Sequence, residues 1–291
     1  MPRILLLGAS GQLGIEISRA QIPARWTLSA LGRDMLDLSE PAAVAAAIEA
    51  AKPDAIINAS AYTAVDKAEA EPELAFALNR DAPAAMAQAA ARLGVPLIHV
   101  STDYVFSGDK PTPYVEDDPR QPANVYGRSK AEGEVAVLEA WDRAAVVRTS
   151  WVFSAHRANF LKTMLRLGET RDDVGVVSDQ YGRPTHAGDL ARGCIALAER
   201  LLDGDAGAAG VFHFAGKGDA TWADFADVIF TETQSYGRGR VRVRRILTAE
   251  YPTPAARPTN SRLDTAKIEA LGIVPADWRD GVRDSVRELL G

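Results

Sequence analysis

A tyrosine and a lysine four positions apart are the residues of this sequence best suited to proton transfer. Tyr126 and Lys130 lie in the segment Tyr-Gly-Arg-Ser-Lys, and side chains at i and i+4 share one face of a helix. Because an ammonium beside a phenol favours the phenolate, the spacing predicts that Lys130 lowers the pKa of Tyr126 and makes it a usable proton donor. The pair alone is a weak signal, since such spacing is common on solvated helix faces.

A hydroxyl group is expected close to this pair. Thr102 ends an apolar run that starts at Val95 and is typical of a buried parallel strand. Ligands of open α/β sheets bind at the carboxyl ends of the strands. The sequence therefore predicts that the Thr102 hydroxyl emerges at the ligand-binding edge of a sheet.

A glycine-rich turn near the start of the chain indicates a nucleotide site. An apolar strand over residues 3–7 leads into Gly-Ala-Ser-Gly-Gln-Leu-Gly (8–14), and a helical pattern follows. Glycines in this position permit a tight turn and let the backbone approach a pyrophosphate at the start of the helix. The alternative is a glycine-rich strand-to-helix turn without a ligand.

The choice between two dinucleotides is expected after the second strand. Arg33 and Asp34 follow that strand, about twenty positions beyond the glycine turn. A carboxylate there would accept a hydrogen bond from the ribose 2′-hydroxyl of NAD, whereas a guanidinium would pair with the 2′-phosphate of NADP. Arg33 comes first and Asp34 could serve as a turn residue, so we favour NADPH, with NADH as the alternative.

Strands and helices alternate strictly over the first half of the chain. This rhythm predicts an α/β fold with a Rossmann-like, doubly wound parallel sheet, including one long helix over residues 74–93. Beyond Phe153 the rhythm loosens. We expect an NADP(H)-binding domain of residues 1–153, together with about 174–210. We expect a smaller C-terminal α/β substrate-binding part formed by residues 154–173 and 211–291.

Composition excludes several classes of protein. The chain has 291 residues, 47% of them hydrophobic, and a net charge of −6, which argues against a nucleic-acid partner. No apolar run approaches the roughly 18 residues of a membrane span. The lone Cys194 and the lack of a leader pattern predict a cytoplasmic protein. The four histidines are scattered without metal-binding spacing, so we expect no metal.

Seven motifs together resemble one family over nearly the whole chain. They are Gly-Ala-Ser-Gly-Gln-Leu-Gly (8–14), Ala-Tyr-Thr-Ala-Val-Asp-Lys-Ala-Glu (61–69), Ser-Thr-Asp-Tyr-Val-Phe (101–106), Val-Tyr-Gly (125–127), Arg-Thr-Ser-Trp-Val (148–152), Asp-Gln-Tyr-Gly-Arg-Pro-Thr (179–185) and Arg-Pro-Thr-Asn-Ser-Arg-Leu (257–263). The chain thereby resembles the extended short-chain dehydrogenase/reductases, and within them the reductases that act on thymidine-diphosphate 4-keto-6-deoxy sugars.

The resemblance implies a role for specific residues. It implies that NADPH reduces the C4 ketone of a dTDP-4-keto-6-deoxy sugar, dTDP-4-dehydro-L-rhamnose, to give dTDP-L-rhamnose. The implied catalytic residues are Thr102, Tyr126 and Lys130, and the implied substrate-binding residues are Thr102, Asp103 and Trp151. The residues expected to bind the cofactor are Gly8, Ser10, Gly11, Gln12, Leu13, Gly14, Arg33, Asp37, Leu38, Ala61, Tyr62, Thr63, Tyr126 and Lys130.

The sequence leaves several alternatives open. Family members commonly carry a histidine at Tyr62 and a plain residue at Arg33, so NADH stays an alternative to NADPH. Some members pair through a metal bridged by glutamates; Glu16 matches one such position, but no second glutamate is evident, and a homodimer stays open. A nucleotide-sugar epimerase with tightly bound NAD and a non-catalytic NADP-binding regulatory subunit are the rival functions. Retention of all three catalytic side chains favours an enzyme.

Overall fold

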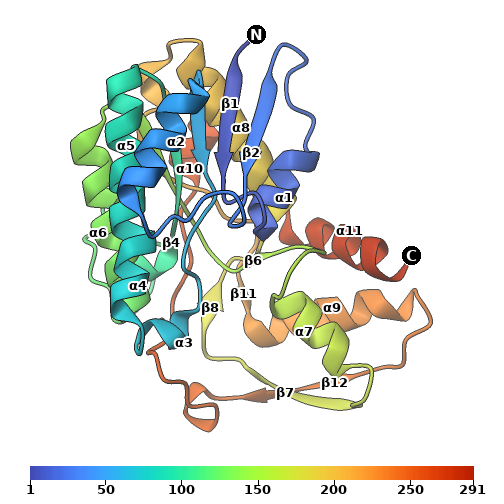
Figure 1. The fold of residues 1–291 in the computed structure, drawn as a ribbon. Helices are drawn as coiled ribbons and strands as arrows, with labels where there is room; N and C mark the ends of the chain where they lie inside the picture. The colour runs from blue at the N-terminus through green and yellow to red at the C-terminus, as the bar shows by residue number, and fades with distance from the viewer.

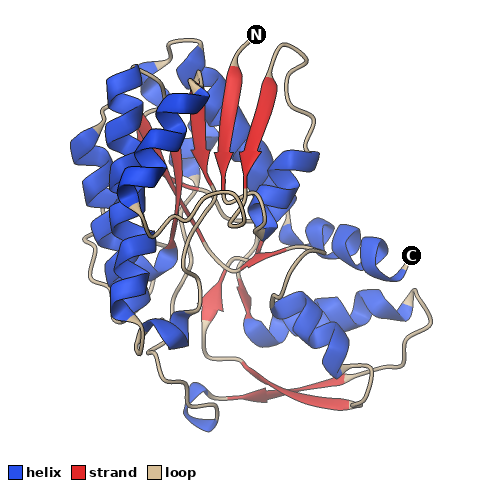
Figure 2. Ribbon diagram, viewed as in Figure 1, coloured by secondary structure: helices blue, strands red, loops and turns tan.

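The computed structural model describes all residues 1–291, and a six-stranded parallel sheet forms its centre (Figures 1 and 2). The strand order is β2-β1-β3-β4-β5-β10, and all neighbouring strands run parallel. The strands are β1 (Arg3–Leu7), β2 (Thr27–Leu31), β3 (Ala55–Asn58), β4 (Leu97–Thr102), β5 (Ala144–Thr149) and β10 (Gly210–His213). Side chains of β1, β3 and β5 are almost entirely buried, as expected for a sheet that is covered on both faces.

Helices cover both faces of this sheet, which confirms the predicted α/β fold. On one face, α2 (Pro41–Ala51), α5 (Ala82–Leu93) and α6 (Val125–Ala140) lie side by side. On the other, α1 (Gln12–Arg19) packs against α8 (Ala187–Leu202). The short α10 (Ala266–Ala270) contacts β10. The order in which successive strands are added to the sheet reverses between β1 and β3, and such a switch point is where open α/β sheets bind ligands.

A second hydrophobic core lies beyond the carboxyl ends of the main strands. It is built from α7 (Phe160–Leu167), α9 (Trp222–Gln234), α11 (Trp278–Leu290) and the parallel pair β7 (Asp173–Val177) and β12 (Arg242–Ile246) (Figure 1). Two-residue strands join this region to the sheet: β6 (Val152–Phe153) pairs with β9 (Thr185–His186), and β8 (Tyr181–Gly182) pairs with β11 (Ala220–Thr221). No helix is both long and apolar enough to cross a membrane.

Strand pairing corrects the expected division of the chain at two places. We expected β7 in the cofactor-binding domain and residues from 211 onward in the smaller part, yet β7 pairs only with β12, and β10 is an edge strand of the main sheet. Along β7, Val174 and Val176 are buried between more exposed neighbours, the pattern of a strand packed on one face. The order of elements along the sequence therefore misplaced both strands.

The expected long helix over residues 74–93 is interrupted. It consists of α4 (Pro72–Phe76), a π-helical turn labelled η1 (Ala77–Asp81), and α5. A side chain at Gly133 of α6 would overlap the Asn79 carbonyl, so glycine lets α6 approach this turn closely. Single π-turns inside helices occur frequently at functional sites. Here the turn buries Asn79 beside the start of α6.

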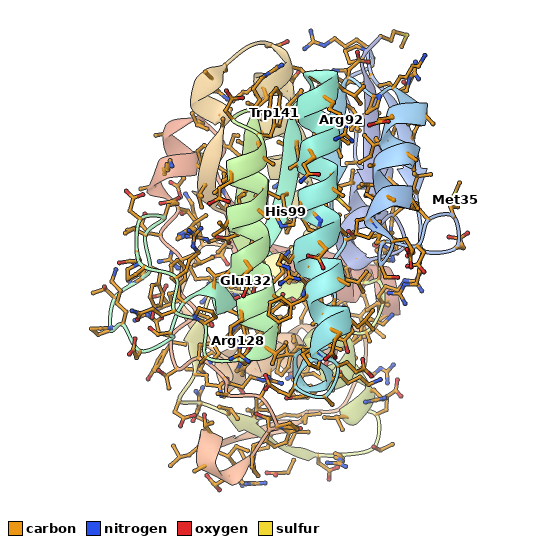
Figure 3. All side chains as sticks on the ribbon, turned by 60° about the vertical axis from the view of Figure 1, so that its left-hand side comes forward. Met35, Arg92, His99, Arg128, Glu132 and Trp141 are labelled. Atoms are coloured by element: carbon orange, nitrogen blue, oxygen red, sulfur yellow. The ribbon has the colours of Figure 1, made fainter.

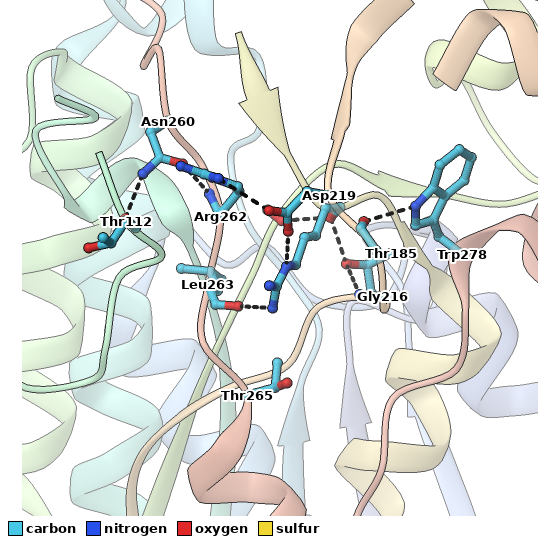
Figure 4. Close-up of polar contacts among 12 residues, drawn as sticks. Thr112, Thr185, Gly216, Asp219, Asn260, Arg262, Leu263, Thr265 and Trp278 are labelled. Carbon is cyan, nitrogen blue, oxygen red and sulfur yellow. Dashed lines mark hydrogen bonds and ion pairs between the residues drawn. The ribbon is translucent and has the colours of Figure 1, made fainter. Parts of the chain in front are cut away.

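Two of the seven motifs meet in space through one carboxylate. Asp219 accepts hydrogen bonds from Arg183 at 2.7 Å and from Arg262 at 3.2 Å (Figure 4). Asn260 in turn donates to the Thr112 carbonyl at 2.8 Å, which ties the same C-terminal stretch to the loop after β4. These contacts fix the smaller region against the carboxyl end of the main sheet.

Candidate functional site

Tyr126 and Lys130 lie in the first turns of α6, and the start of that helix is held by three separate segments. Asn124 caps the helix by accepting from the Gly127 backbone N–H at 2.7 Å. Glu69 accepts from the Val125 N–H at 2.8 Å. A side chain on Gly127 would overlap the Tyr104 carbonyl, so this glycine lets α6 pack directly against the turn after β4.

Thr102 lies next to Tyr126 at the end of β4. Thr102, Tyr126 and Lys130 are 6%, 8% and 1% exposed, so all three side chains are shielded from bulk water. The Thr102 hydroxyl accepts from the Tyr104 N–H at 3.3 Å and donates to Asp103 at 3.1 Å. It also influences the pKa of Tyr126, which it lowers. The structure thus brings together the three side chains that the sequence selected.

The predicted acidification of Tyr126 is wrong for this geometry. Burial raises the pKa of Tyr126 to about 12, and the opposing influence is the Thr102 hydroxyl rather than Lys130. The Lys130 ammonium is directed elsewhere, because its Nζ donates to the Val100 carbonyl at 2.7 Å. Burial also lowers the pKa of Lys130 to about 8. The helical spacing was correct, but it did not reveal that both charged forms would be penalised by desolvation.

Asp103 adds a carboxyl group to the same corner. Burial raises the pKa of Asp103 to about 7, although the hydroxyls of Ser261 and Thr102 act in the opposite direction. One of its oxygens, Oδ2, is buried without a hydrogen-bond partner. A pKa of about 7 means that the Asp103 carboxyl group can be neutral or charged near neutral pH. In the same corner, the rings of Tyr104 and Tyr126 meet edge to face with centroids 5.4 Å apart.

The glycine turn has the backbone that close ligand approach requires. Gly8 has φ +85°, and a Cβ there would lie 2.6 Å from the Ser60 nitrogen. A Cβ at Gly14 would overlap the Gly8 carbonyl. Helix α1 starts at Gln12 without a side-chain cap, so its first N–H groups remain available for an anion. These features fit the pyrophosphate of a dinucleotide.

Other residues of this turn contact the loop after β6 instead of remaining free. The Gln12 side-chain oxygen accepts from Asn159 at 2.8 Å and from Ser154 at 3.2 Å. The Ser10 carbonyl accepts from Arg157 Nε at 2.7 Å. Leu13 is buried in the core beneath α1. The Gln12 side chain therefore links the glycine turn to the loop after β6, and Leu13 packs into the hydrophobic core.

The residues expected to contact the 2′ position of the cofactor's adenosine ribose lie on an exposed loop. Arg33 and Asp34 are exposed after β2. Asp37 is exposed as well; it accepts from the Ser39 hydroxyl and N–H, and these bonds lower its pKa. Leu38 packs against the core under α2.

Asn79 supports the loop that contains Ala61, Tyr62 and Thr63. Its side chain accepts from the Tyr62 N–H at 2.8 Å and donates to the Tyr62 carbonyl at 3.1 Å. It also donates to Ser129 on α6 at 2.9 Å. This asparagine therefore holds the loop after β3 against the helix that carries Tyr126. The Tyr62 hydroxyl donates to Glu71, which raises the pKa of Tyr62 to about 12.

Two further polar residues, Asn58 and His99, were missed by sequence reasoning. Both are fully buried; Asn58 ends β3, and His99 lies in the middle of β4 directly behind Lys130. Their only signal in the sequence was a polar residue inside an apolar strand. Such a residue needs a hydrogen-bond partner when it is buried.

Trp151 forms an aromatic wall beyond the end of β5. Its backbone adopts φ +50°, which is rare for a residue with a side chain. Its ring stacks on Trp222 with centroids 3.6 Å apart, and Trp222 in turn contacts Phe160. A side chain at Gly182 would overlap the Trp151 ring. Trp151 is thus clamped between β8 and the start of α9.

The arrangement offers a phenol, an amine, a hydroxyl and a carboxyl group in one buried corner. These groups lie at the carboxyl end of β4, at the same edge of the sheet as the glycine turn after β1 and Trp151 after β5. No group of three or more His, Cys, Asp or Glu side chains is placed where it could hold a metal ion. The geometry can donate a proton to, and hydrogen-bond, an oxygen of a bound substrate.

Comparisons with known proteins agree with this geometry over the whole chain. The model of the RmlD substrate binding domain matches residues 2–290. The dTDP-4-dehydrorhamnose reductase of Sinorhizobium fredii is 47% identical over 290 residues, which are 99% of this chain and 98% of that relative.

Solved structures give the same result. The dTDP-4-dehydrorhamnose reductase of Clostridium acetobutylicum superposes with a TM-score of 0.92 and 36% identity, covering 99% of both chains. The Bacillus anthracis reductase, solved in complex with NADP, gives a TM-score of 0.90 and 34% identity, again over 99% of both chains. The chain therefore belongs to the RmlD family, the family of the dTDP-4-dehydrorhamnose reductases.

Proposed function

We propose that this protein reduces the C4 ketone of dTDP-4-dehydro-L-rhamnose with NADPH to give dTDP-L-rhamnose. The observation that carries the proposal is the buried set of Thr102, Tyr126 and Lys130 at the same edge of the sheet as the glycine turn. Relatives of similar length and high identity are named for this reaction. A pure nucleotide binder would need no buried proton donor.

Tyr126 supplies the proton in this mechanism. NADPH supplies the hydride when bound, and its transfer to C4 leaves negative charge on the ketone oxygen. Tyr126 gives its phenolic proton to that oxygen, which completes the alcohol. A pKa of about 12 keeps the phenol protonated at neutral pH, the form needed for reduction, while an alkoxide is a much stronger base. The raised pKa therefore suits a proton donor.

Thr102 and Lys130 are the two side chains that assist Tyr126. Thr102 Oγ1 lies at the end of β4, and its hydroxyl can donate to the same ketone oxygen once it rotates away from Asp103. One well-placed donor of this kind contributes roughly 3 kcal/mol to transition-state stabilisation. Lys130 would hydrogen-bond the ribose of the bound cofactor. Trp151 offers its apolar ring to the sugar, and Asp103 binds a sugar hydroxyl.

The cofactor assignment rests on the turn and on one exposed cation. Gly8, Gly11 and Gly14 let the backbone approach the pyrophosphate, with Ser10, Gln12 and Leu13 completing the turn. We assign the 2′-phosphate of NADPH to Arg33, and the remaining contacts to Asp37, Leu38, Ala61, Tyr62 and Thr63. The lone buried cysteine, Cys194, agrees with a cytoplasmic location.

An NADPH-oxidation assay tests the proposal. Purified protein should oxidise NADPH when dTDP-4-keto-L-rhamnose is added, and more slowly with UDP-4-keto-L-rhamnose as the matched control. Release of tightly held NAD on denaturation, without net NADPH consumption, would identify an epimerase instead. Failure to turn over any 4-keto sugar, with NADP binding intact, would identify a regulatory binding subunit.

A further inference from the structure

A hydrogen-bonded chain lies behind Lys130 and links three elements of the fold. Asn58 and His99 are opposite each other in the register of β3 and β4. The Asn58 amide nitrogen lies 2.9 Å from His99 Nδ1, and His99 Nε2 lies 3.4 Å from Lys130 Nζ. Figure 3 shows His99 between α6 and α5, beneath the helical layer. All three side chains are at most 1% exposed, so water does not compete for these contacts.

The backbone N–H of Ser60 determines which groups donate and which accept along the hydrogen bonds from Asn58 through His99 to Lys130. The Ser60 N–H can only donate, and it donates to Asn58 Oδ1 at 3.0 Å. The amide oxygen of Asn58 must therefore point toward Ser60, which turns its NH₂ group toward His99. Since that group can only donate, His99 Nδ1 must accept.

It follows which nitrogen of His99 carries the proton. Burial and the nearby Lys130 hold the pKa of His99 well below 6.5, so the ring is neutral and has one N–H. With Nδ1 acting as acceptor, the proton resides on Nε2 and points at Lys130. An N–H directed at an ammonium is unfavourable, whereas an N–H directed at an amine nitrogen forms a hydrogen bond. The Val100 carbonyl, 2.7 Å from Nζ, can accept from either form of the lysine.

We propose that Asn58 and His99 are positioning residues that fix Lys130 against Val100 and favour the amine form of its side chain. This inference rests on the proposed role of Lys130 in the reduction. The pKa of about 8 that burial gives Lys130 supports it.

Other charges around Lys130 do not replace this effect. Glu134, one turn along α6, raises the pKa of Lys130, but its carboxylate is bound by Arg148 from β5 at 2.7 Å. Three further charged groups come from segments near α6. Arg80 on η1 is paired with Asp81 and Glu132, and Asp66 is paired with Arg257. Asp103 accepts from Thr102 through one oxygen, while its other oxygen is buried without a partner.

The tautomer of His99 tests the inference without any activity measurement. Long-range ¹H–¹⁵N NMR of ¹⁵N-histidine-labelled protein resolves Nδ1–H from Nε2–H rings, and loss of one signal set in His99→Gln assigns the residue. We expect a neutral Nε2–H ring at His99 from pH 6 to 9. A Nδ1–H ring in the unaltered protein would overturn the proposal, and this measurement does not depend on any variant of Asn58 folding.

Reversing the donor and acceptor roles along the hydrogen bonds from Asn58 through His99 tests their effect on Lys130. In Asn58→Asp the new carboxylate can only accept, so it should draw the proton of His99 to Nδ1 and turn Nε2 into an acceptor for the ammonium. We expect the titration of Lys130, followed by ¹³Cε-lysine NMR and by the alkaline limb of kcat/KM, to move upward by at least one pH unit. Ser60→Ala loses the hydroxyl that also donates to Asn58 Oδ1 but keeps the backbone N–H that orients the amide, so it should leave both unchanged. An unmoved Lys130 titration in Asn58→Asp would contradict the proposal.

These readouts separate this inference from the proposed function. The protein could show an Nε2–H ring at His99 and a shifted lysine titration, yet reduce no 4-keto sugar. That result would contradict the proposed function but not the donor and acceptor order from Asn58 through His99 to Lys130. An active reductase with the opposite tautomer would contradict only the role of Asn58 and His99.

Discussion

The buried corner of Thr102, Tyr126 and Lys130 and the aromatic wall of Trp151 are the two parts of the candidate site, and they are built in opposite ways. Thr102 and Lys130 are buried and held by polar contacts with the ends of β4 and the first turns of α6. Trp151 is only half-buried and is held by stacking on Trp222 in the smaller region. Groups that exchange protons need a dry environment that fixes their protonation states, whereas recognition of a sugar needs an apolar plane.

The cofactor region shows the same contrast on a smaller scale. The glycine turn is tightly packed, since side chains at Gly8 or Gly14 would overlap neighbouring backbone atoms. Arg33, by comparison, is exposed on the loop after β2. We therefore expect substitutions to have their largest effects in the buried corner and their smallest at the exposed arginine.

Removal of the Tyr126 hydroxyl should have the largest effect. Tyr126→Phe loses the proton donor but keeps the ring, so kcat should fall about 10²- to 10⁴-fold with little change in NADPH affinity. Steady-state kinetics and fluorescence titration with NADPH measure the two quantities. Tyr104→Phe removes a hydroxyl from the adjacent ring and should change kcat only severalfold. Near-normal kcat in Tyr126→Phe would refute the catalytic role.

A side chain added to the glycine turn should have the second-largest effect, on the binding of NADPH. The Cβ in Gly14→Ala would overlap the Gly8 carbonyl, and relief of such overpacking typically costs about 1–3 kcal/mol. We expect the KM for NADPH to rise about 10- to 100-fold, with a smaller rise in Gly11→Ala, whose Cβ would lie 3.5 Å from the same oxygen. Equal losses in the two variants would mean that crowding is not the cause.

Loss of the aromatic support should affect substrate recognition alone. Trp222→Ala removes the ring on which Trp151 stacks, and such pairs contribute roughly 0.5–1.5 kcal/mol. The KM for the sugar nucleotide should rise about 3- to 10-fold, while the KM for NADPH stays constant. Trp141→Ala at the far end of α6 removes an equal ring away from the site and should leave both KM values unchanged (Figure 3). A parallel rise in the KM for NADPH would contradict a separate aromatic wall.

The exposed cation should give the smallest effect. An exposed ion pair contributes roughly 0.2–1 kcal/mol, so Arg33→Ala should raise the KM for NADPH about two- to fivefold and leave that for NADH unchanged. Asp34→Ala is the control for loss of a neighbouring charge. If Arg33→Ala does not alter NADPH usage, the 2′-phosphate is bound elsewhere.

The periodicity of apolar residues predicted the strands and helices of the first half of the chain well. The strand that ends at Thr102 and the helix that carries Tyr126 and Lys130 lie where periodicity put them. Local pattern failed where partners come from distant segments. β7 pairs with β12 some seventy residues later, and the π-turn around Asn79 lies directly against Gly133 of α6.

The sequence by itself determined which side chains can do chemistry and in what order they occur. Spacing of four on a helix and the end of an apolar strand are local properties, and they selected Thr102, Tyr126 and Lys130. Only the tertiary structure decided their protonation states and the chain from Asn58 through His99. A pKa depends on desolvation and on hydrogen bonds from atoms far away in sequence, and β3, β4 and α6 supply these atoms only after they have packed together.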